Sequence, residues 1–348
     1  MKTISHSDLP NADVSTVGIV PISSIFPIET FYAAKTPAYI HNDGSMFRFF
    51  AIPRIDIASI TEAIKLLEYG SSMQIYRYHV PNSEQYFISV RKEIEYGNAT
   101  PSSIFKNFTL NPVKTQFKTM SALMSKAYDS ISRVVSKVSN TTEIDYLTSD
   151  LPHLLVDFEL KNNAVVSIPV RSNLSFLKLG KSKFGTMISL NNMTVIPQTH
   201  HCLNDHSFLQ RIVLINPSMK RRGYLQVATI DNAKLIEALT EKKAPKKENQ
   251  FSVDTLVHNV SEILPRGGRI FYADVTWLIL SDTMDSLNEK LNKFYSCMEN
   301  NNVALYCHTN TTKASYISMF PGNDPYGERY TLLFEHFMHM LIWKALEL

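Results

Sequence analysis

Residues 269–280 read RIFYADVTWLIL. Apolar, aromatic and β-branched side chains dominate this run, which predicts a buried β-strand. Further elements are predicted on both sides of it: strands over residues 208–215 and 303–308, and helices over residues 224–243, 253–264 and 282–298. Strands and helices that alternate in this way are typical of a compact α+β domain.

The first 200 residues also mix strands and helices. The clearest helix covers residues 113–138, because apolar side chains recur there at alternating steps of four and three residues. Shorter elements are strands over residues 46–52, 73–80 and 85–90, a helix over residues 57–69 with Gly70 as its C-cap, and hairpins around Asn162–Asn163 and Asn191–Asn192.

These patterns together predict an α+β fold of two lobes, with antiparallel or mixed sheets and long amphipathic helices. Because 348 residues exceed the usual size of one core, we expect a boundary near residue 200. The N-terminal lobe, residues 1–200, holds the hairpins and the long helix. The C-terminal lobe, residues 201–348, ends in a Pro-Gly-Asn turn and a terminal helix from Thr331 onward.

Composition limits the classes of function. Lysine and arginine number 35 against 32 acidic residues, a net charge of +3, which is too small for a dedicated nucleic-acid binder. The N-terminus lacks the apolar core of a signal peptide, and no apolar run is long enough to span a bilayer. The three cysteines form no disulfide framework. We therefore expect a cytoplasmic protein.

One stretch partly matches a phosphate-binding loop. Gly180, Lys181 and Ser182 supply the end of the G-x-x-x-x-G-K-[ST] pattern, but Ser175 stands where its first glycine belongs. The loop also needs a helix after it, whose N-terminal amides face the phosphates, and a strand is predicted here instead. The sequence therefore argues against a nucleotide site.

The strongest metal candidate is a cluster of His200, His201, Cys202 and His206. Imidazole and thiolate are suitable zinc ligands, but a second pair of ligands is missing from the sequence nearby. A polar linker between the lobes explains the cluster better, and a metal-dependent enzyme is the alternative. We predict no catalytic residue and no metal ligand.

Two basic clusters flank the helix predicted over residues 224–243. They are candidates for contact with an anionic membrane surface or a partner protein, and solvated helix ends are the alternative. Their members are Lys220, Arg221, Arg222, Lys242, Lys243, Lys246 and Lys247.

Residues 314–323 read ASYISMFPGN. Proline presets φ at the first corner of a turn and glycine permits positive φ at the second, so Pro321, Gly322 and Asn323 predict a turn. The stretch resembles the F-x-x-L-P-G-N element of the type IV secretion and conjugation ATPases (CagE/TrbE/VirB type), with Phe320 in place of the leucine. The order of elements over residues 207–323 is similar to that family as well.

The resemblance implies the N-terminal domain of such an ATPase, without its motor. The element marks the end of that domain in the family, and Arg329 beyond it is a candidate for contact with a partner. The implied partners are the ATPase domain, secretion subunits at the bacterial inner membrane and further copies of the chain, as a hexamer. No cofactor is expected in this chain, since the family binds ATP through the motor domain. No specific nucleic-acid partner is expected.

Overall fold

The computed structural model describes residues 19–21, 28–33, 37–41, 44–81, 83–94, 113–145, 167–172, 176–179, 183–190, 207–216, 270–300, 305–308, 311–323 and 330–333. Within these residues the helices are α2 (Ile57–Lys65), α4 (Val113–Val135), α9 (Met284–Asn300) and α10 (Thr312–Ser318). The strands are β1 (Ile19–Pro21), β2 (Ile28–Ala33), β3 (Pro37–His41), β4 (Met46–Ile52), β5 (Ser71–Val80), β6 (Ser83–Lys92), β7 (Thr142–Glu143), β8 (Ser167–Ser172), β9 (Leu177–Leu179), β10 (Lys183–Leu190), β11 (Phe208–Asn216), β12 (Ile270–Ser281), β13 (Leu305–Cys307) and β14 (Tyr330–Leu333).

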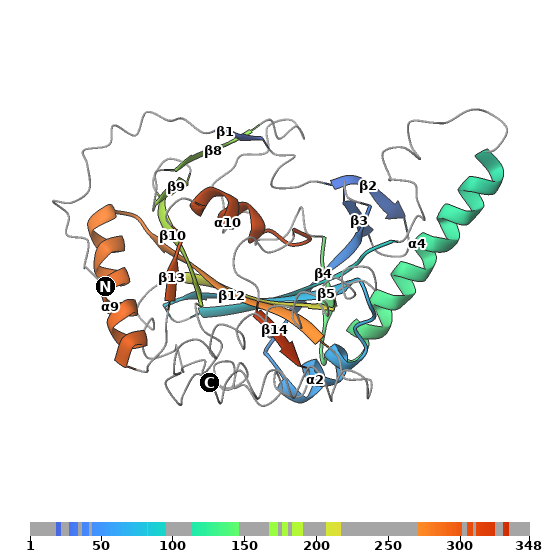
Figure 1. Cartoon of the computed structure of the whole chain (residues 1–348), viewed down its shortest axis with the longest axis horizontal. Helices are drawn as coiled ribbons and strands as arrows, with labels where there is room; N and C mark the ends of the chain where they lie inside the picture. Colours follow the sequence, from blue (N-terminus) through green and yellow to red (C-terminus); the bar gives the residue numbers. More distant parts are fainter. Residues whose placement is uncertain are drawn as a thin grey trace, which may run out of the picture.

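All of these strands belong to one 14-stranded sheet (Figure 1). Its main path runs β1-β8-β9-β10-β12-β11-β5-β6-β4-β3-β2, while β13 pairs with β10, β14 with β12 and β7 with β4. Neighbouring strands are antiparallel throughout. The chain is therefore of the α+β class, as the sequence predicts.

The middle of the sheet is covered on both faces. All nine residues of β11 are buried, which explains why its sequence, FLQRIVLIN, is largely apolar rather than alternating. β11 pairs with β12 on one side and with β5 on the other. Strands from before and after residue 200 thus form one continuous sheet.

Two apolar clusters fill the two faces. On one face α2, α4 and α9 pack on the sheet, with Ile64, Ile131 and Phe294 among their buried side chains. On the other face α10 lies against the strands, and its Tyr316 and the following Phe320 complete the second cluster. Figure 1 shows α10 on the concave side of the curved sheet, with α2 on the opposite side.

Most elements predicted within the described residues are present. The long strand is β12, its flanking elements are β11, α9 and β13, and the hairpin around Pro81 joins β5 to β6. Helix α4 begins at the predicted residue and ends at Val135, after which residues 136–140 form turns. The predicted helices over residues 224–243 and 253–264, and most of both asparagine hairpins, lie outside the described residues.

Two predictions were wrong. Thr331 does not begin a terminal helix, because β14 covers Tyr330–Leu333 and pairs with the start of β12. Gly70 is not a C-cap, because α2 ends at Lys65 and Leu66 caps it. Instead Gly70, at φ 71°, donates its N–H to the Asn216 carbonyl and accepts from the Glu93 N–H, which fixes the start of β5.

Strands β1, β2, β3, β7 and β9 and helix α10 were not predicted. α10 separates β13 from the Pro-Gly-Asn turn, and it is only seven residues long.

Among the helices that the structure describes, none combines the length and the apolar character that crossing a bilayer requires.

Candidate functional site

The Pro-Gly-Asn turn follows α10 and faces the sheet. Gly322 has φ 86°, as the turn prediction requires. A Cβ at this position would lie 2.8 Å from the ring of Phe47 in β4, closer than side chains normally approach. Phe320 is fully buried beside it. Only glycine therefore fits at position 322, and the backbone of the turn faces its own sheet rather than a neighbouring domain.

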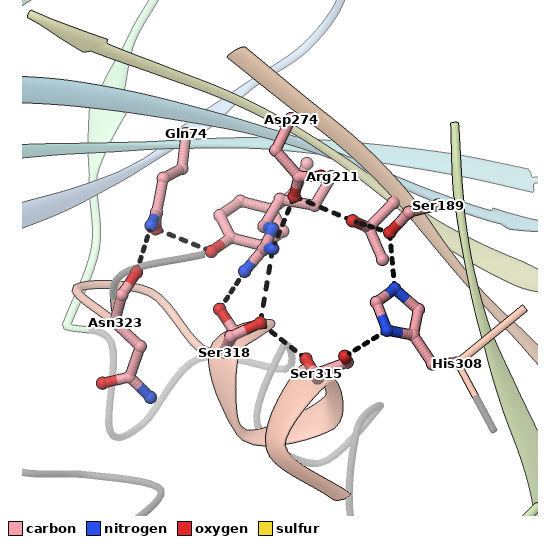
Figure 2. Close-up of polar contacts among 10 residues, drawn as sticks. Gln74, Ser189, Arg211, Asp274, His308, Ser315, Ser318 and Asn323 are labelled. Atoms are coloured by element: carbon pink, nitrogen blue, oxygen red, sulfur yellow. Dashed lines mark hydrogen bonds and ion pairs between the residues drawn. The ribbon is translucent and has the colours of Figure 1, made fainter. Parts of the chain in front are cut away.

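Gln74 of β5 binds the backbone of this turn. Its amide nitrogen donates to the Asn323 carbonyl at 2.7 Å, and its amide oxygen accepts from the Gly322 N–H at 3.2 Å. Tyr76 donates to the same amide oxygen at 2.8 Å, which fixes the orientation of the amide group. The close-up in Figure 2 shows Gln74 reaching from the sheet toward Asn323.

The Asn323 side chain makes two further bonds. Its Oδ1 accepts from Nε2 of His41 in β3 at 3.0 Å, and its Nδ2 donates to the Ile317 carbonyl in α10 at 2.7 Å. The turn is therefore tied to β3, β5 and α10 at once, with Asn323 at the point where they meet.

A buried ion pair holds the end of α10. Arg211 of β11 is fully buried, and its Nη2 donates to Oδ2 of Asp274 in β12 at 3.0 Å. Its Nη1 donates to the Ser318 carbonyl at the C-terminus of α10. A buried guanidinium is more stable when its charge is paired and its donors are used. The end of α10 thus supplies an acceptor to Arg211, whose Nε has no hydrogen-bond partner within the described residues.

A chain of hydroxyl groups joins this pair to His308, which follows β13 (Figure 2). Thr276 donates to Asp274 Oδ2 at 2.8 Å, so its oxygen can only accept from Ser189 Oγ, 2.9 Å away. Ser189 has then used its hydrogen and accepts from Nε2 of His308 at 2.7 Å. The direction of these bonds assigns the proton of neutral His308 to Nε2.

The other ring nitrogen of His308 faces α10. Nδ1 has one lone pair and accepts from a hydroxyl group at the start of the helix, where Ser315 Oγ lies 2.7 Å and Thr311 Oγ1 3.0 Å away. Burial lowers the pKa of His308 to about 4; Asp274 acts in the opposite direction and Arg211 in the same direction. His308 is therefore neutral near pH 7 and bridges β10 to α10.

Serine, histidine and aspartate occur together here, as they do in hydrolases, but the bonds run the wrong way for catalysis. A nucleophilic serine must donate its hydrogen bond to histidine. Ser189 instead donates its hydrogen bond to Thr276 and accepts one from His308. Ser189 and His308 are also both buried. The group is best explained as the polar attachment of α10 to the sheet.

Sequence reasoning placed Phe320, Pro321, Gly322 and Asn323 in one motif, and the structure joins them to the sheet. Arg329, the metal candidates His200, His201, Cys202 and His206, and the seven residues of the basic clusters lie outside the described residues. Among the residues that are described, no group of three or more possible metal ligands occurs.

The partial phosphate loop can be judged from its flanks. Gly180, Lys181 and Ser182 connect β9 to β10, which pair antiparallel, with Lys183 opposite Leu179. A strand rather than a helix follows the loop, as the sequence predicts. Cys307 is a free thiol and Cys297 is disulfide-bonded, whereas the sequence predicts that the three cysteines form no disulfide framework.

Sequence reasoning missed the residues that hold the motif in place: Gln74, Ser189, Arg211, Asp274 and His308. A signal was present for two of them, because Arg211 and Asp274 are charges of opposite sign within apolar strands. Buried charges are normally paired, so the two could have been matched.

No family model matches the chain, and no curated protein shows significant similarity to it.

We expect Gly322→Ala to lower the free energy of unfolding by about 2–4 kcal/mol, because it adds both positive-φ strain and a clash with Phe47. Gly70→Ala is the matched control, since it shares the positive φ but meets only the Glu93 side chain, at 3.3 Å or more. Its expected cost is about 1–2 kcal/mol. Urea denaturation measures both, and equal losses would contradict the close approach at Gly322.

The pKa of His308 predicts an acid-sensitive stability. Between its ordinary pKa of 6.5 and its folded value of about 4, the unfolded chain binds a proton that the folded chain does not. The free energy of unfolding should therefore fall as the pH falls through this window, by up to about 1.4 kcal/mol per pH unit. Urea denaturation at pH 7, 6 and 5 should show a weaker dependence for His308→Gln; an unchanged dependence would rule out His308 as the cause.

Proposed function

We propose that this chain is the N-terminal assembly and docking domain of a type IV secretion or conjugation ATPase, and that it has no catalytic site of its own. The proposal starts from the likeness of residues 314–323 to the family's F-x-x-L-P-G-N element. In that family the element ends the domain that precedes the motor.

The observation that carries the proposal is the anchoring of this element. Gln74 and His41 bind Asn323, the glycine of the motif packs on Phe47, and Arg211 holds the end of α10. These bonds fix the element with respect to the sheet. A junction between a docking domain and a motor needs such fixed geometry, because a loose junction would not set the motor's position.

The same proposal assigns the partners. The domain would join the motor to secretion subunits at the cytoplasmic face of the bacterial inner membrane, and copies would assemble as a hexamer. Arg329 and the basic clusters at residues 220–222 and 242–247 are the proposed contacts with partner proteins or anionic headgroups. ATP would bind only to the motor domain.

Assembly and nucleotide binding test the proposal together. Sedimentation velocity of the purified chain should show concentration-dependent association toward a hexamer, and Arg329→Ala should weaken it. Titration calorimetry with Mg-ATP should show no saturable binding. A protein that stays monomeric at all concentrations would contradict the assembly function. ATP binding that Lys181→Ala abolishes would contradict the absence of a nucleotide site.

A further inference from the structure

The first half of the sheet has the connectivity of a split β-α-β unit. In chain order β4, α2, β5, β6, α4 and β7 alternate as strand, helix, strand, strand, helix, strand. In space the strands lie in the order β7-β4-β6-β5. This is the ferredoxin-like arrangement, in which the fourth strand lies outside the first and the third lies between the first and second.

The second half repeats the strand order. β10, β11, β12 and β13 follow each other in the chain and lie in the order β13-β10-β12-β11. Helix α9 lies between the third and fourth strands, as α4 does in the first half. Each half is also preceded by a hairpin strand on its first strand, β3 on β4 and β9 on β10. The residues between β10 and β11 lie outside the described part.

The two halves meet at equivalent strands. β5 and β11 are the second strand of each half, and they pair antiparallel from His79–Phe208 to Ser71–Asn216. Antiparallel pairing of equivalent strands relates the halves by an approximate two-fold axis, which passes near the pair Ile75–Ile212. The centre of the sheet is therefore a junction between two similar units.

Residues 308 and 311–323 cross this junction; we call them the strap. At one end, Nε2 of His308 donates to Ser189 of the second half, and Ser315 bonds the other nitrogen of the same ring. At the other end, Asn323 binds Gln74 and His41 of the first half. Between these ends, the Ser318 carbonyl accepts from Arg211, which lies on the junction strand β11.

We propose that the strap locks the junction. While the strap is bound to both halves, the two halves behave as one body; when it is released from one half, the pairing of β5 with β11 loosens. Polar bonds to both halves make the strap a bridge, whereas a helix packed on one half would only cover it. This inference does not depend on the proposed function. It predicts that releasing the strap from one half loosens the pairing of β5 with β11.

Gln74→Ala tests the lock, because it removes both bonds from Gln74 to the turn. Hydrogen exchange of the whole chain, read by mass spectrometry, should become about tenfold faster in residues 316–323 and in the junction strands β5 and β11. Strands β4 and β10, which lie inside the two halves, should accelerate much less.

Ser89→Ala is the matched control. Ser89 lies opposite Gln74 in the register of β5 and β6 and is equally buried, and its hydroxyl has no hydrogen-bond partner in the part of the chain that the structure describes. Its exchange pattern should match the wild type. If Gln74→Ala fails to fold, Asn323→Ala replaces it, since it removes the bonds to His41 and to Ile317.

Two outcomes would overturn the inference. Faster exchange in the strap with unchanged β5 and β11 would mean that the strap covers the junction without locking it. An equal acceleration over β4, β5, β10 and β11 would mean that the substitution destabilises the whole sheet and that the halves have no separate junction.

Discussion

The structure depends on the burial of Arg211 beside Asp274 in the middle of the sheet. Removing both charges from water is costly, and hydrogen bonds to the remaining donors and acceptors offset part of that cost. Asp274 accepts from Arg211 and from Thr276, while the guanidinium also needs the Ser318 carbonyl. The central strands and α10 therefore require each other: without α10 the ion pair is incomplete, and without the ion pair α10 loses its main polar contact.

The short length of α10 makes this dependence stronger. A helix of seven residues has little stability of its own, so its conformation comes from its surroundings. Those surroundings are polar at both ends, with His308 and Thr311 before the first turn and Arg211 at the last. The apolar side chains Tyr316 and Phe320 add burial on the sheet. The polar bonds determine where the segment sits, and the apolar contacts contribute to how firmly it is held.

Much of the fold could be predicted from local pattern. Residues 269–280 and the helical stripe from Met284 to Met298 carry their signal within a few residues, so β12 and α9 lie close to the predicted bounds. Residues 331–333 were misread, because pairing with β12 rather than local period decides their conformation. Gly70 was misread for a similar reason, since its bonds go to Asn216 and Glu93.

The site was predictable only in part. The turn at Pro321 and Gly322 has a local sequence signature and was found. Its contacts were not, because Gln74 and Asn323 are 249 residues apart in the chain and meet through strand register alone. Charges such as Arg211 and Asp274 within apolar strands indicate a buried pair, although the sequence does not say that α10 completes it.

The most direct test of this account is the energetic coupling between two attachments of the strap, the central one at Ser318 and the C-terminal one at Asn323. One change is the pair Arg211→Met with Asp274→Leu, which removes the central contact without leaving a buried charge; the other is Gln74→Ala. Urea denaturation of each variant and of their combination gives the coupling. If the segment acts as one anchored body, the combined loss falls short of the sum of the separate losses by more than about 0.5 kcal/mol. Losses that add within that margin would show that the two attachments act independently, and would contradict the account.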